Sequence, residues 1–431
     1  MKILLIGSGG REHAFAWKIT QSAHCEKLYT APGNAGTSAL GENVAIGSND
    51  FEKLGSFCLE KGIDLVVVGP EEPLVQGIRN YFEAKNELKD IPIVGPGKEG
   101  AQLEGSKDFS KQFMARHGVP TAAYQTFTKD TLEEGLIFIR KQELPIVLKA
   151  DGLAAGKGVL ICNDYGEAFR EFKEMLLEEK FGAASHKVVI EEFLKGIELS
   201  VFVAIDGSDY VILPEAKDYK RIGDHDTGLN TGGMGAVSPV PFADEVFMQK
   251  VKERVVMPTL HGLKKDGIPY QGFIFIGLMN KSGDPYVVEY NVRMGDPETQ
   301  AVLPRIKSDF VELLYGIATQ RLSKYILEIS TFAVTTVVMV AGGYPETYEK
   351  GKPIHGLEGI DETDSLVFHA GTTFAESGEV ITNGGRVLGI TGKGDDMQDA
   401  ISNAYGKVKK IQWNGAYYRK DIGQDILQVL K

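Results

Sequence analysis

The sequence predicts a protein of several domains that combine α/β and α+β architecture. A chain of 431 residues, of which 43% are hydrophobic, can bury several separate cores. Its N-terminal segment alternates short apolar strands with helical stretches, which is typical of a parallel sheet. Its C-terminal segment contains a buried-strand pattern and the turn signal Asn383-Gly384-Gly385, which together indicate a separate α+β domain.

The N-terminal segment has the order of repeated βαβ units. We expect strands at 2–6, 27–31, 64–68 and 91–94, and helices at 12–20 and 73–85. A Gly-rich stretch then leads into an expected helix at 103–117, which ends before Gly118 and Pro120. We place a domain boundary in this region and expect an N-terminal domain over 1–104.

The rest of the chain divides into two further expected domains. A central domain over 105–325 includes a small α+β unit at 124–193, with strands at 145–150 and 187–191. A C-terminal domain over 326–431 opens with an unbroken apolar strand pattern at 332–341. Another strand, at 386–390, follows the turn signal.

Composition excludes several classes of protein. The formal net charge of −12 and the pI near 5.3 argue against a nucleic-acid surface, because phosphate backbones are held by clustered Lys and Arg. Three scattered cysteines support neither a disulfide framework nor a zinc cluster. No apolar run suits a signal peptide or a membrane helix. We expect a cytoplasmic monomer with small-molecule partners and no nucleic-acid or membrane partner.

The first candidate site is the turn Gly7-Ser8-Gly9-Gly10-Arg11, between the first strand and the first helix. The N–H groups and the dipole of a helix start suit a phosphate. A dinucleotide fold is one interpretation, although Glu12 replaces the third fingerprint glycine and no acidic residue ends the second strand. A mononucleotide site, a sugar-phosphate site and simple close packing are the others. The turn at Asn34 would face the same crevice, or would be an ordinary turn.

The second candidate is Lys149, at a strand end, with the glycine loop that follows it. A lysine there can place its ammonium on a triphosphate while backbone N–H groups close over the phosphates. The loop is not a Walker A motif, because three residues separate Gly152 from Gly156 and because Gly158, after Lys157, replaces the hydroxyl residue. A surface hairpin with two solvated lysines is the alternative.

The third candidate is the strand end Glu191-Glu192-Phe193-Leu194, with Glu198 just beyond it. Backbone groups at a strand end beside an apolar wall can bind a purine edge, and an acidic side chain can hold ribose hydroxyls. A solvated strand edge is the alternative.

The fourth candidate is the strand around Glu289, Asn291 and Arg293. Side chains alternate along a strand, so these three project from one face. A carboxylate and an amide oxygen suit Mg²⁺, and a guanidinium can brace a transferring phosphoryl group. An exposed polar face is the alternative.

A fifth candidate is the pair of segments 218–224 and 227–236. Many glycines and hydroxyls lie there beside Lys220-Arg221, which suggests a loop built around a ligand. A charged turn is the alternative.

Taken in this order, the motifs resemble the glycinamide ribonucleotide synthetase family over essentially the whole chain. The resemblance rests on 7–13, 31–36, 68–71, 103–107, 149–159, 226–239, 295–300 and 383–388. It implies an ATP-grasp fold with a Rossmann-like N-terminal domain and a small C-terminal domain. This chain departs from many members at Lys217, Tyr219, Val292 and Met294.

The resemblance also implies site residues, a cofactor and a metal. ATP phosphates would contact Lys107, Lys149 and the loop Gly156-Lys157-Gly158, and adenosine would contact Glu191, Glu192, Phe193, Leu194 and Glu198. Glu289 and Asn291 would bind Mg²⁺ or Mn²⁺. The sugar phosphate would meet Gly9, Gly10, Arg11 and Asn34. Asp218, Lys220, Arg293 and Asp296 would lie near glycine and the transferred phosphoryl group, with Arg293, Lys149, Asp218 and Lys220 in catalytic roles.

The implied reaction needs no nucleophilic side chain. The carboxylate of glycine attacks the γ-phosphorus of ATP, and the amine of phosphoribosylamine then displaces phosphate from glycyl phosphate, as a step of purine biosynthesis. The alternatives are another ATP-grasp carboxylate–amine ligase, a non-catalytic nucleotide-binding regulator and an NAD-dependent oxidoreductase.

Overall fold

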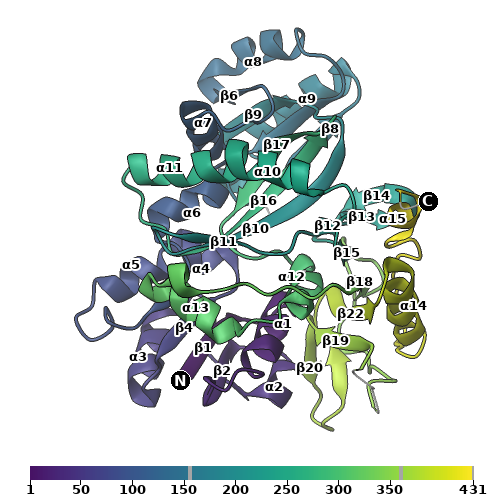
Figure 1. Ribbon diagram of the computed structural model, residues 1–431. Coiled ribbons are helices and arrows are strands. Elements are labelled where there is room, and N and C mark those ends of the chain that lie inside the picture. Colours follow the sequence, from purple (N-terminus) through teal and green to yellow (C-terminus); the bar gives the residue numbers. More distant parts are fainter. Residues whose placement is uncertain (154–157, 359–362, 430–431) are drawn as a thin grey trace.

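The computed structural model describes residues 1–153, 158–358 and 363–429 (Figure 1). Its N-terminal segment forms a parallel sheet of order β3-β2-β1-β4-β5. The strands are β1 (Lys2–Gly7), β2 (Lys27–Pro32), β3 (Glu42–Asn43), β4 (Leu65–Val68) and β5 (Ile93–Val94). The four predicted strands and their parallel arrangement are confirmed, and β3 is a short edge strand that the apolar pattern does not reveal.

Two N-terminal segments that were each predicted as one helix form two helices in the structure, so these predictions are wrong. Residues 73–85 form two helices because Gly77, with a φ of 90°, breaks the run. Residues 103–117 divide at Ser106, whose extended backbone ends one helix and whose Oγ accepts from the Phe109 N–H at 3.0 Å to cap the next. The helices are α1 (Gly10–Ile19), α2 (Thr37–Leu40), α3 (Phe51–Lys61), α4 (Glu71–Gln76), α5 (Ile78–Glu83), α6 (Lys98–Gly105) and α7 (Lys107–His117).

A small antiparallel sheet with its own core follows, at the top of Figure 1. Its order is β6-β9-β7-β8, and two helices pack against it through an apolar cluster that includes Phe127 and Phe172. The elements are β6 (Tyr124–Thr128), α8 (Leu132–Ile139), β7 (Ile146–Ala150), β8 (Val159–Cys162), α9 (Tyr165–Leu177) and β9 (Lys187–Glu192). This unit has the α+β character that the sequence predicts for 124–193.

The second central sheet has the order β11-β10-β16-β17 and lies between the small sheet and the N-terminal domain. One apolar cluster joins it to the N-terminal sheet, with Leu4 and Val66 on one side and Val201 and Ile276 on the other. The elements are β10 (Ile197–Ile205), β11 (Tyr210–Ile212), α10 (Glu245–Val251), α11 (Met257–Lys265), β16 (Gly272–Lys281), β17 (Asp284–Asn291), α12 (Glu298–Val302) and α13 (Phe310–Thr319).

The C-terminal sheet draws strands from two of the expected domains. Its order is β12-β15-β18-β22-β19, and Ser238 of β15 pairs with Val334 of β18. The predicted boundary between 325 and 326 therefore falls between strands of one sheet. The elements are β12 (Lys217–Asp218), β15 (Gly235–Ser238), β18 (Ala333–Val340), β19 (Ser365–His369), β22 (Arg386–Gly394), α14 (Met397–Val408) and α15 (Gln424–Val429), with the hairpins β13 (Arg221–Gly223)–β14 (Thr227–Asn230) and β20 (Thr372–Phe374)–β21 (Val380–Thr382).

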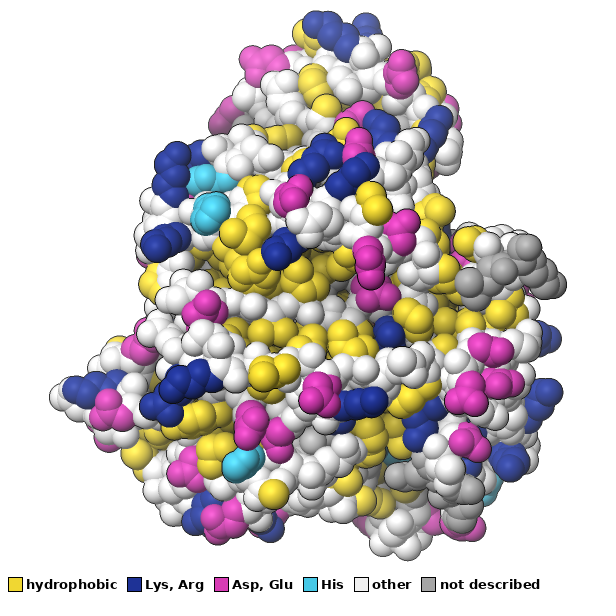
Figure 2. All heavy atoms as spheres, viewed as in Figure 1, with side chains coloured by type: hydrophobic (Ala, Val, Ile, Leu, Met, Phe, Trp, Pro, Cys, Tyr) yellow, Lys and Arg dark blue, Asp and Glu magenta, His cyan; other side chains and the backbone are white. Residues whose placement is uncertain are grey.

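In the face shown in Figure 2, basic and acidic side chains are interspersed rather than gathered into a basic stripe. Among the described residues, no helix combines the length and the apolarity that crossing a membrane requires.

Candidate active site

Three lysines, Lys107, Lys149 and Lys220, lie around the carboxylate of Glu289 at the end of β17. Lys107 begins α7 and donates to the Gly152 carbonyl at 3.0 Å, and Lys149, near the end of β7, is buried and donates to the Val288 carbonyl at 3.2 Å. Burial alone would raise the pKa of the Glu289 carboxyl, but the charges of Lys220, Lys149 and Lys107 outweigh burial and hold this pKa below its usual value. The Glu289 carboxylate therefore lies in a cation-rich site.

A fourth lysine, Lys111, belongs to the same cluster and was not expected from the sequence. One carboxylate oxygen of Glu191 lies 2.9 Å from the Lys111 ammonium and 3.1 Å from the Lys149 ammonium, and all three side chains are buried. Lys111 lies four residues after Lys107 on α7, so its helical spacing was the signal that could have revealed it. The Glu191 side chain thus positions lysines, and its adenosine contact stays a prediction.

The end of β17 brings its three predicted residues together, with a β-bulge that the alternation rule does not include. Gly277 pairs with Glu289 while the next residue, Leu278, pairs with Val287, so Val288 is an extra residue in the strand. After the bulge, Arg293 donates to the Asn291 Oδ1 at 3.1 Å. Arg293 also lies beyond the strand itself, which ends at Asn291.

Arg293 is anchored by carboxylates from the N-terminal part of the chain. It donates to Glu104 Oε1 at 2.8 Å, and its Nε lies 3.5 Å from a carboxylate oxygen of Glu71. The other Glu104 oxygen accepts from the Val292 N–H at 2.7 Å. These contacts fix the guanidinium at the start of the loop that leads to Asp296.

A small apolar wall lies beside the strand end at Glu192. It consists of Ala122, Leu194 and Met279, with Tyr286 and Val288 packed against it. Phe193 is half-buried next to Leu194. Glu198, at the start of β10, pairs with Lys220 at 2.8 Å. The predicted adenosine residues therefore combine an apolar surface, strand-end backbone groups and an acidic side chain, as a purine nucleoside requires.

Two acids, Asp218 and Glu298, lie near Lys220. The Lys220 ammonium lies 3.9 Å from Asp218, and burial together with the Asp218 charge raises the pKa of the Glu298 carboxyl to about 7. The pKa of the Asp218 carboxyl is also raised, by burial first, against the opposing charge of Lys220. Glu298 was not among the predicted site residues, although it lies two residues after Asp296.

Lys217 and Tyr219, two departures from the family pattern, bind the C-terminal helix rather than the site. The Lys217 ammonium lies 3.0 Å from Asp425 of α15 and 3.7 Å from the centre of the Tyr219 ring, and the Tyr219 hydroxyl donates to the same aspartate. Their side chains therefore tie β12 to the end of the chain.

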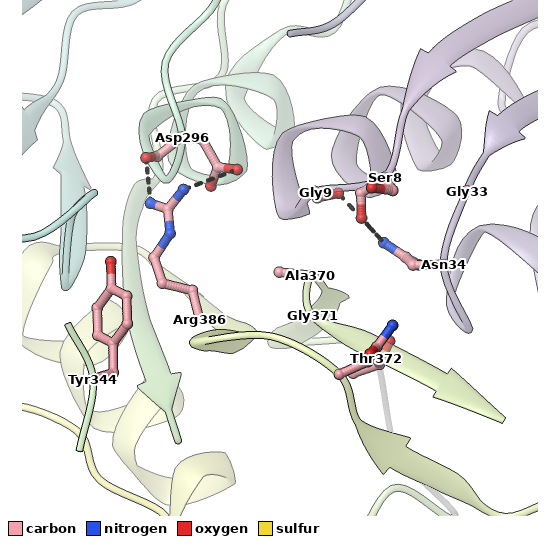
Figure 3. Close-up of a pocket in the computed structure, with 11 residues that line it drawn as sticks. Ser8, Gly9, Gly33, Asn34, Asp296, Tyr344, Ala370, Gly371, Thr372 and Arg386 are labelled. Atoms are coloured by element: carbon pink, nitrogen blue, oxygen red, sulfur yellow. Dashed lines mark hydrogen bonds and ion pairs between the residues drawn. The ribbon is translucent and has the colours of Figure 1, made fainter. Parts of the chain in front are cut away.

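A cavity of about 310 Å³ opens between the N-terminal turn, the Asp296 loop and the C-terminal domain (Figure 3). Its lining residues are Ser8, Gly9, Gly33, Asn34, Asp296, Tyr344, Ala370, Gly371, Thr372, Asn383 and Arg386. Arg386 donates to the carbonyls of Gly232 and Asp296 and lies 3.3 Å from the Asp296 carboxylate. The C-terminal contribution, and Arg386 above all, was missed because the segment 383–388 gives no local signal that it meets Asp296.

Of the predicted N-terminal residues, Gly9 and Asn34 line this cavity, whereas Gly10 and Arg11 do not. The N–H of Arg11 donates to Asp296 Oδ2 at 3.4 Å, and the Arg11 guanidinium is buried against Glu12 and the Met294 carbonyl. The first turn of α1, which includes Gly10, thus already faces the carboxylate of Asp296. Asn34 donates to the carbonyls of Ser8 and His369, both at 2.9 Å. These residues shape the cavity wall with their own contacts.

Two of the predicted phosphate-loop residues, Gly156 and Lys157, lie outside the described residues. Gly158 is described, and its carbonyl accepts from the Ala150 N–H at 2.8 Å, so the far end of the loop returns beside Lys149. The ends of the loop therefore lie at the lysine cluster.

The residues at the end of β17 fit a hard divalent cation that takes part of its shell from a ligand. Glu289 and Asn291 each offer a side-chain oxygen, and Asn291 Oδ1 keeps a second lone pair beside the bond that it accepts from Arg293. Within 1–153, 158–358 and 363–429, no group of three or more His, Cys, Asp or Glu is arranged to hold a metal alone. Mg²⁺ commonly binds one or two protein oxygens and completes its shell with phosphates and water.

The fold and this site define an ATP-grasp ligase: two α+β units face each other across a lysine cluster and a strand-end carboxylate. Family models for phosphoribosylglycinamide synthetase match the N domain over 1–104, the ATP-grasp (A) domain over 105–299 and the C domain over 334–425. The chain belongs to the phosphoribosylglycinamide synthetase family, and the predicted resemblance and fold class are confirmed.

Curated and solved relatives agree with this assignment. Phosphoribosylamine–glycine ligase of Escherichia coli strain K12 is 47% identical over 427 residues, which is 98% of both chains, and the enzyme of Vibrio vulnificus strain CMCP6 is equally similar. The crystal structure of phosphoribosylamine–glycine ligase from Thermotoga maritima superposes with a TM-score of 0.84 at 36% identity, and covers 98% of this chain and 100% of that one.

A more distant likeness concerns the fold alone. The biotin carboxylase domain of Hydrogenobacter thermophilus 2-oxoglutarate carboxylase aligns with a TM-score of 0.73 at 17% identity, over 97% of this chain and 91% of that one.

Proposed function

We propose that the lysine cluster and the cavity described above divide between them the two half-reactions of a phosphoribosylamine–glycine ligase of purine biosynthesis, which is the activity of this chain. The observation that supports this division is a shared carbonyl. Arg11, beside the cavity, and Arg293, beside the cluster, both donate to the Met294 carbonyl, at 3.1 and 3.3 Å. The two sites are therefore neighbours that an acyl phosphate can bridge.

ATP would bind at the lysine cluster, between the small sheet and the second central sheet. Leu194 and the strand end at Glu192 would meet the adenine, Glu198 the ribose, and Lys107 and Lys149 the phosphates. The ammonium groups of the lysine cluster are the kind of donor that a triphosphate needs.

Glu289 and Asn291 would hold Mg²⁺ or Mn²⁺. When bound there, the metal would neutralise the charge on the phosphate oxygens of ATP. The carboxylate and amide oxygens at the end of β17 suit either ion.

The first half-reaction would form glycyl phosphate. The glycine carboxylate oxygen attacks the γ-phosphorus, the bond to the bridging oxygen breaks, and ADP leaves. Arg293 would orient the transferring group, because Glu104 and Asn291 already hold its guanidinium. Lys220, between Glu198 and Asp218, would balance charge near glycine.

The second half-reaction would take place at the mouth of the cavity. The amine of phosphoribosylamine attacks the acyl carbon, phosphate leaves, and the amine loses a proton. The hydroxyl of Thr372 and the guanidinium of Arg386 would hold the sugar phosphate, with Asp296 beside the amine or a ribose hydroxyl. Gly9, whose N–H already donates to Glu12 Oε2 at 2.6 Å, would form the wall beside them. We also propose that the enzyme is a monomer and that it works in the cytoplasm.

The test is ADP release with Mg²⁺-ATP, glycine and phosphoribosylamine generated in situ. Each substrate is omitted in turn, and alanine or bicarbonate replaces glycine. Turnover that needs both glycine and the sugar amine supports the proposal. ADP release with another acid would point to a different carboxylate–amine ligase, and no ADP under any combination would point to a nucleotide-binding regulator.

A further inference from the structure

His13, on α1, is buried at the contact between the N-terminal and C-terminal domains. Its Nδ1 accepts a hydrogen bond from the backbone N–H of His369 at 2.7 Å, which joins residues 356 positions apart in the chain. Burial, with a smaller effect of the His369 ring, lowers the pKa of His13 to about 3. The ring is therefore neutral at physiological pH and keeps its Nδ1 lone pair available as an acceptor.

The carbonyl of the same residue is held from the same side. The Asn34 side-chain amide donates to the His369 carbonyl at 2.9 Å, and it also donates to Ser8 in the N-terminal turn. Both peptide groups of His369 thus bind side chains of the N-terminal domain. The His13 ring is closely packed as well, since a Cβ placed on Gly36 would lie 2.2 Å from it.

His369 is directly followed by the cavity wall. Ala370, Gly371 and Thr372 line the cavity, and the Thr372 hydroxyl lies 3.1 Å from the His369 Nδ1. On their other side, the N–H groups of Ala370 and Gly371 donate to carbonyls of β22. Figure 3 shows this wall opposite Ser8, Gly9 and Asn34, across the cavity. The attachment of His369 therefore sets the width of the cavity.

We propose that His13 is a positioning residue for the sugar-phosphate substrate: its Nδ1 anchors the His369 peptide and thereby holds the wall 370–372 at the distance that fits this substrate. The inference rests on the proposed function of the cavity. The residue does not line the cavity and touches no reacting atom, so its effect passes through the wall. A substitution that removes the Nδ1 acceptor should weaken the binding of the sugar-phosphate substrate and leave the binding of ATP and of glycine unchanged.

The test compares four variants by the KM of each substrate and by the rise in melting temperature with ribose 5-phosphate. His13→Phe fills the site without an acceptor, and His13→Ser is too short to reach His369. His13→Asn is the rescue, because its Oδ1 can take the place of Nδ1. His24→Phe is the matched control, at an exposed histidine of the same domain.

We expect His13→Phe and His13→Ser to raise the KM of phosphoribosylamine about 10-fold and to reduce the shift with ribose 5-phosphate, because a buried N–H loses its partner. His13→Asn and His24→Phe should stay within about 3-fold of the parent enzyme. Unchanged KM values in both His13→Phe and His13→Ser would overturn the inference. Equal rises in the KM of all three substrates, with no rescue by His13→Asn, would also overturn it. A parent enzyme with no turnover on the sugar amine would instead overturn the proposed function.

Discussion

The ammonium of Lys149 lies 3.1 Å from a carboxylate oxygen of Glu191, and both side chains are buried. The same oxygen lies 2.9 Å from Lys111, so one negative charge is shared by two positive ones. These three side chains therefore carry a net positive charge before any ligand arrives. Burial of unbalanced charge costs stability, and a triphosphate would offset that cost.

Glu191→Gln should destabilise the fold, and most strongly when no ATP is bound. Without the Glu191 carboxylate, the two buried ammoniums lose the counter-charge that they share, and we expect a loss of about 3 kcal/mol in the free energy of unfolding. Denaturant unfolding with and without ATP measures this loss. Glu134→Gln, at an exposed position on α8, is the control. Equal stability of the two variants would contradict the shared-carboxylate arrangement.

Glu289→Gln should abolish ligase turnover while leaving the fold intact. The amide keeps the shape of the side chain but removes the charge that three lysines face and that a divalent cation requires, so we expect roughly a 100-fold loss of kcat in Mg²⁺. Asp284→Asn is the matched control, because Asp284 begins the same strand and pairs with Lys250 and Arg254 outside the site. Parent-level turnover of Glu289→Gln would rule out Glu289 as a metal ligand.

Arg386→Lys should weaken the binding of phosphoribosylamine alone. Lysine keeps the charge but cannot bind the carbonyls of Gly232 and Asp296 with one planar fork. We expect the KM of phosphoribosylamine to rise about 10-fold, with the KM of ATP and of glycine unchanged. Arg254→Lys, a half-exposed arginine on another element, serves as the control. A rise of similar size in the KM of ATP would show that Arg386 does not act selectively on the sugar substrate.

Glu298 should make stability depend on pH. The pKa of its carboxyl is raised from 4.5 to about 7, so the folded state keeps the proton at pH values where the unfolded chain has lost it. The stabilising contribution is complete below about 4.5, falls as pH rises towards 7, and is absent above. Glu298→Gln, which mimics the protonated acid, should flatten this part of the profile by up to roughly 3 kcal/mol.

Melting temperatures of the parent, Glu298→Gln and an exposed control, Glu133→Gln, between pH 5 and 8 measure the effect of Glu298. The parent and the control should lose stability together over this interval. Identical slopes for all three proteins would show that Glu298 titrates normally.

Local signals in the sequence were enough for the strands of the N-terminal sheet, because runs such as Leu65–Val68 are apolar on both faces and buried. They were not enough for helix ends. Gly77 and Ser106 divide helices at positions where the apolar spacing continues, and only the backbone conformation shows the break. The alternation rule likewise placed Glu289 and Asn291 on one face but could not foresee the extra residue at Val288.

The site residues that escaped sequence reasoning are those whose partners are distant in the chain. Lys111 meets Glu191 across 80 residues, and Arg386 meets Asp296 across 90. The spacing of Lys111 after Lys107 and the place of Arg386 in the segment 383–388 are local signals, but neither shows which distant residue it meets. Their roles follow from the tertiary fold, whereas Lys149 and Glu289 stand in motifs that already carry the chemistry.

The C-terminal sheet also has a consequence for synthesis on the ribosome. β15 leaves the ribosome well before β18, its partner in the sheet, because 96 positions separate Ser238 from Val334, so the earlier strand waits with an open edge. At usual elongation rates the wait lasts on the order of ten seconds. An unpaired strand edge invites association with other nascent chains, and it is during this interval that the protein has most to gain from a chaperone.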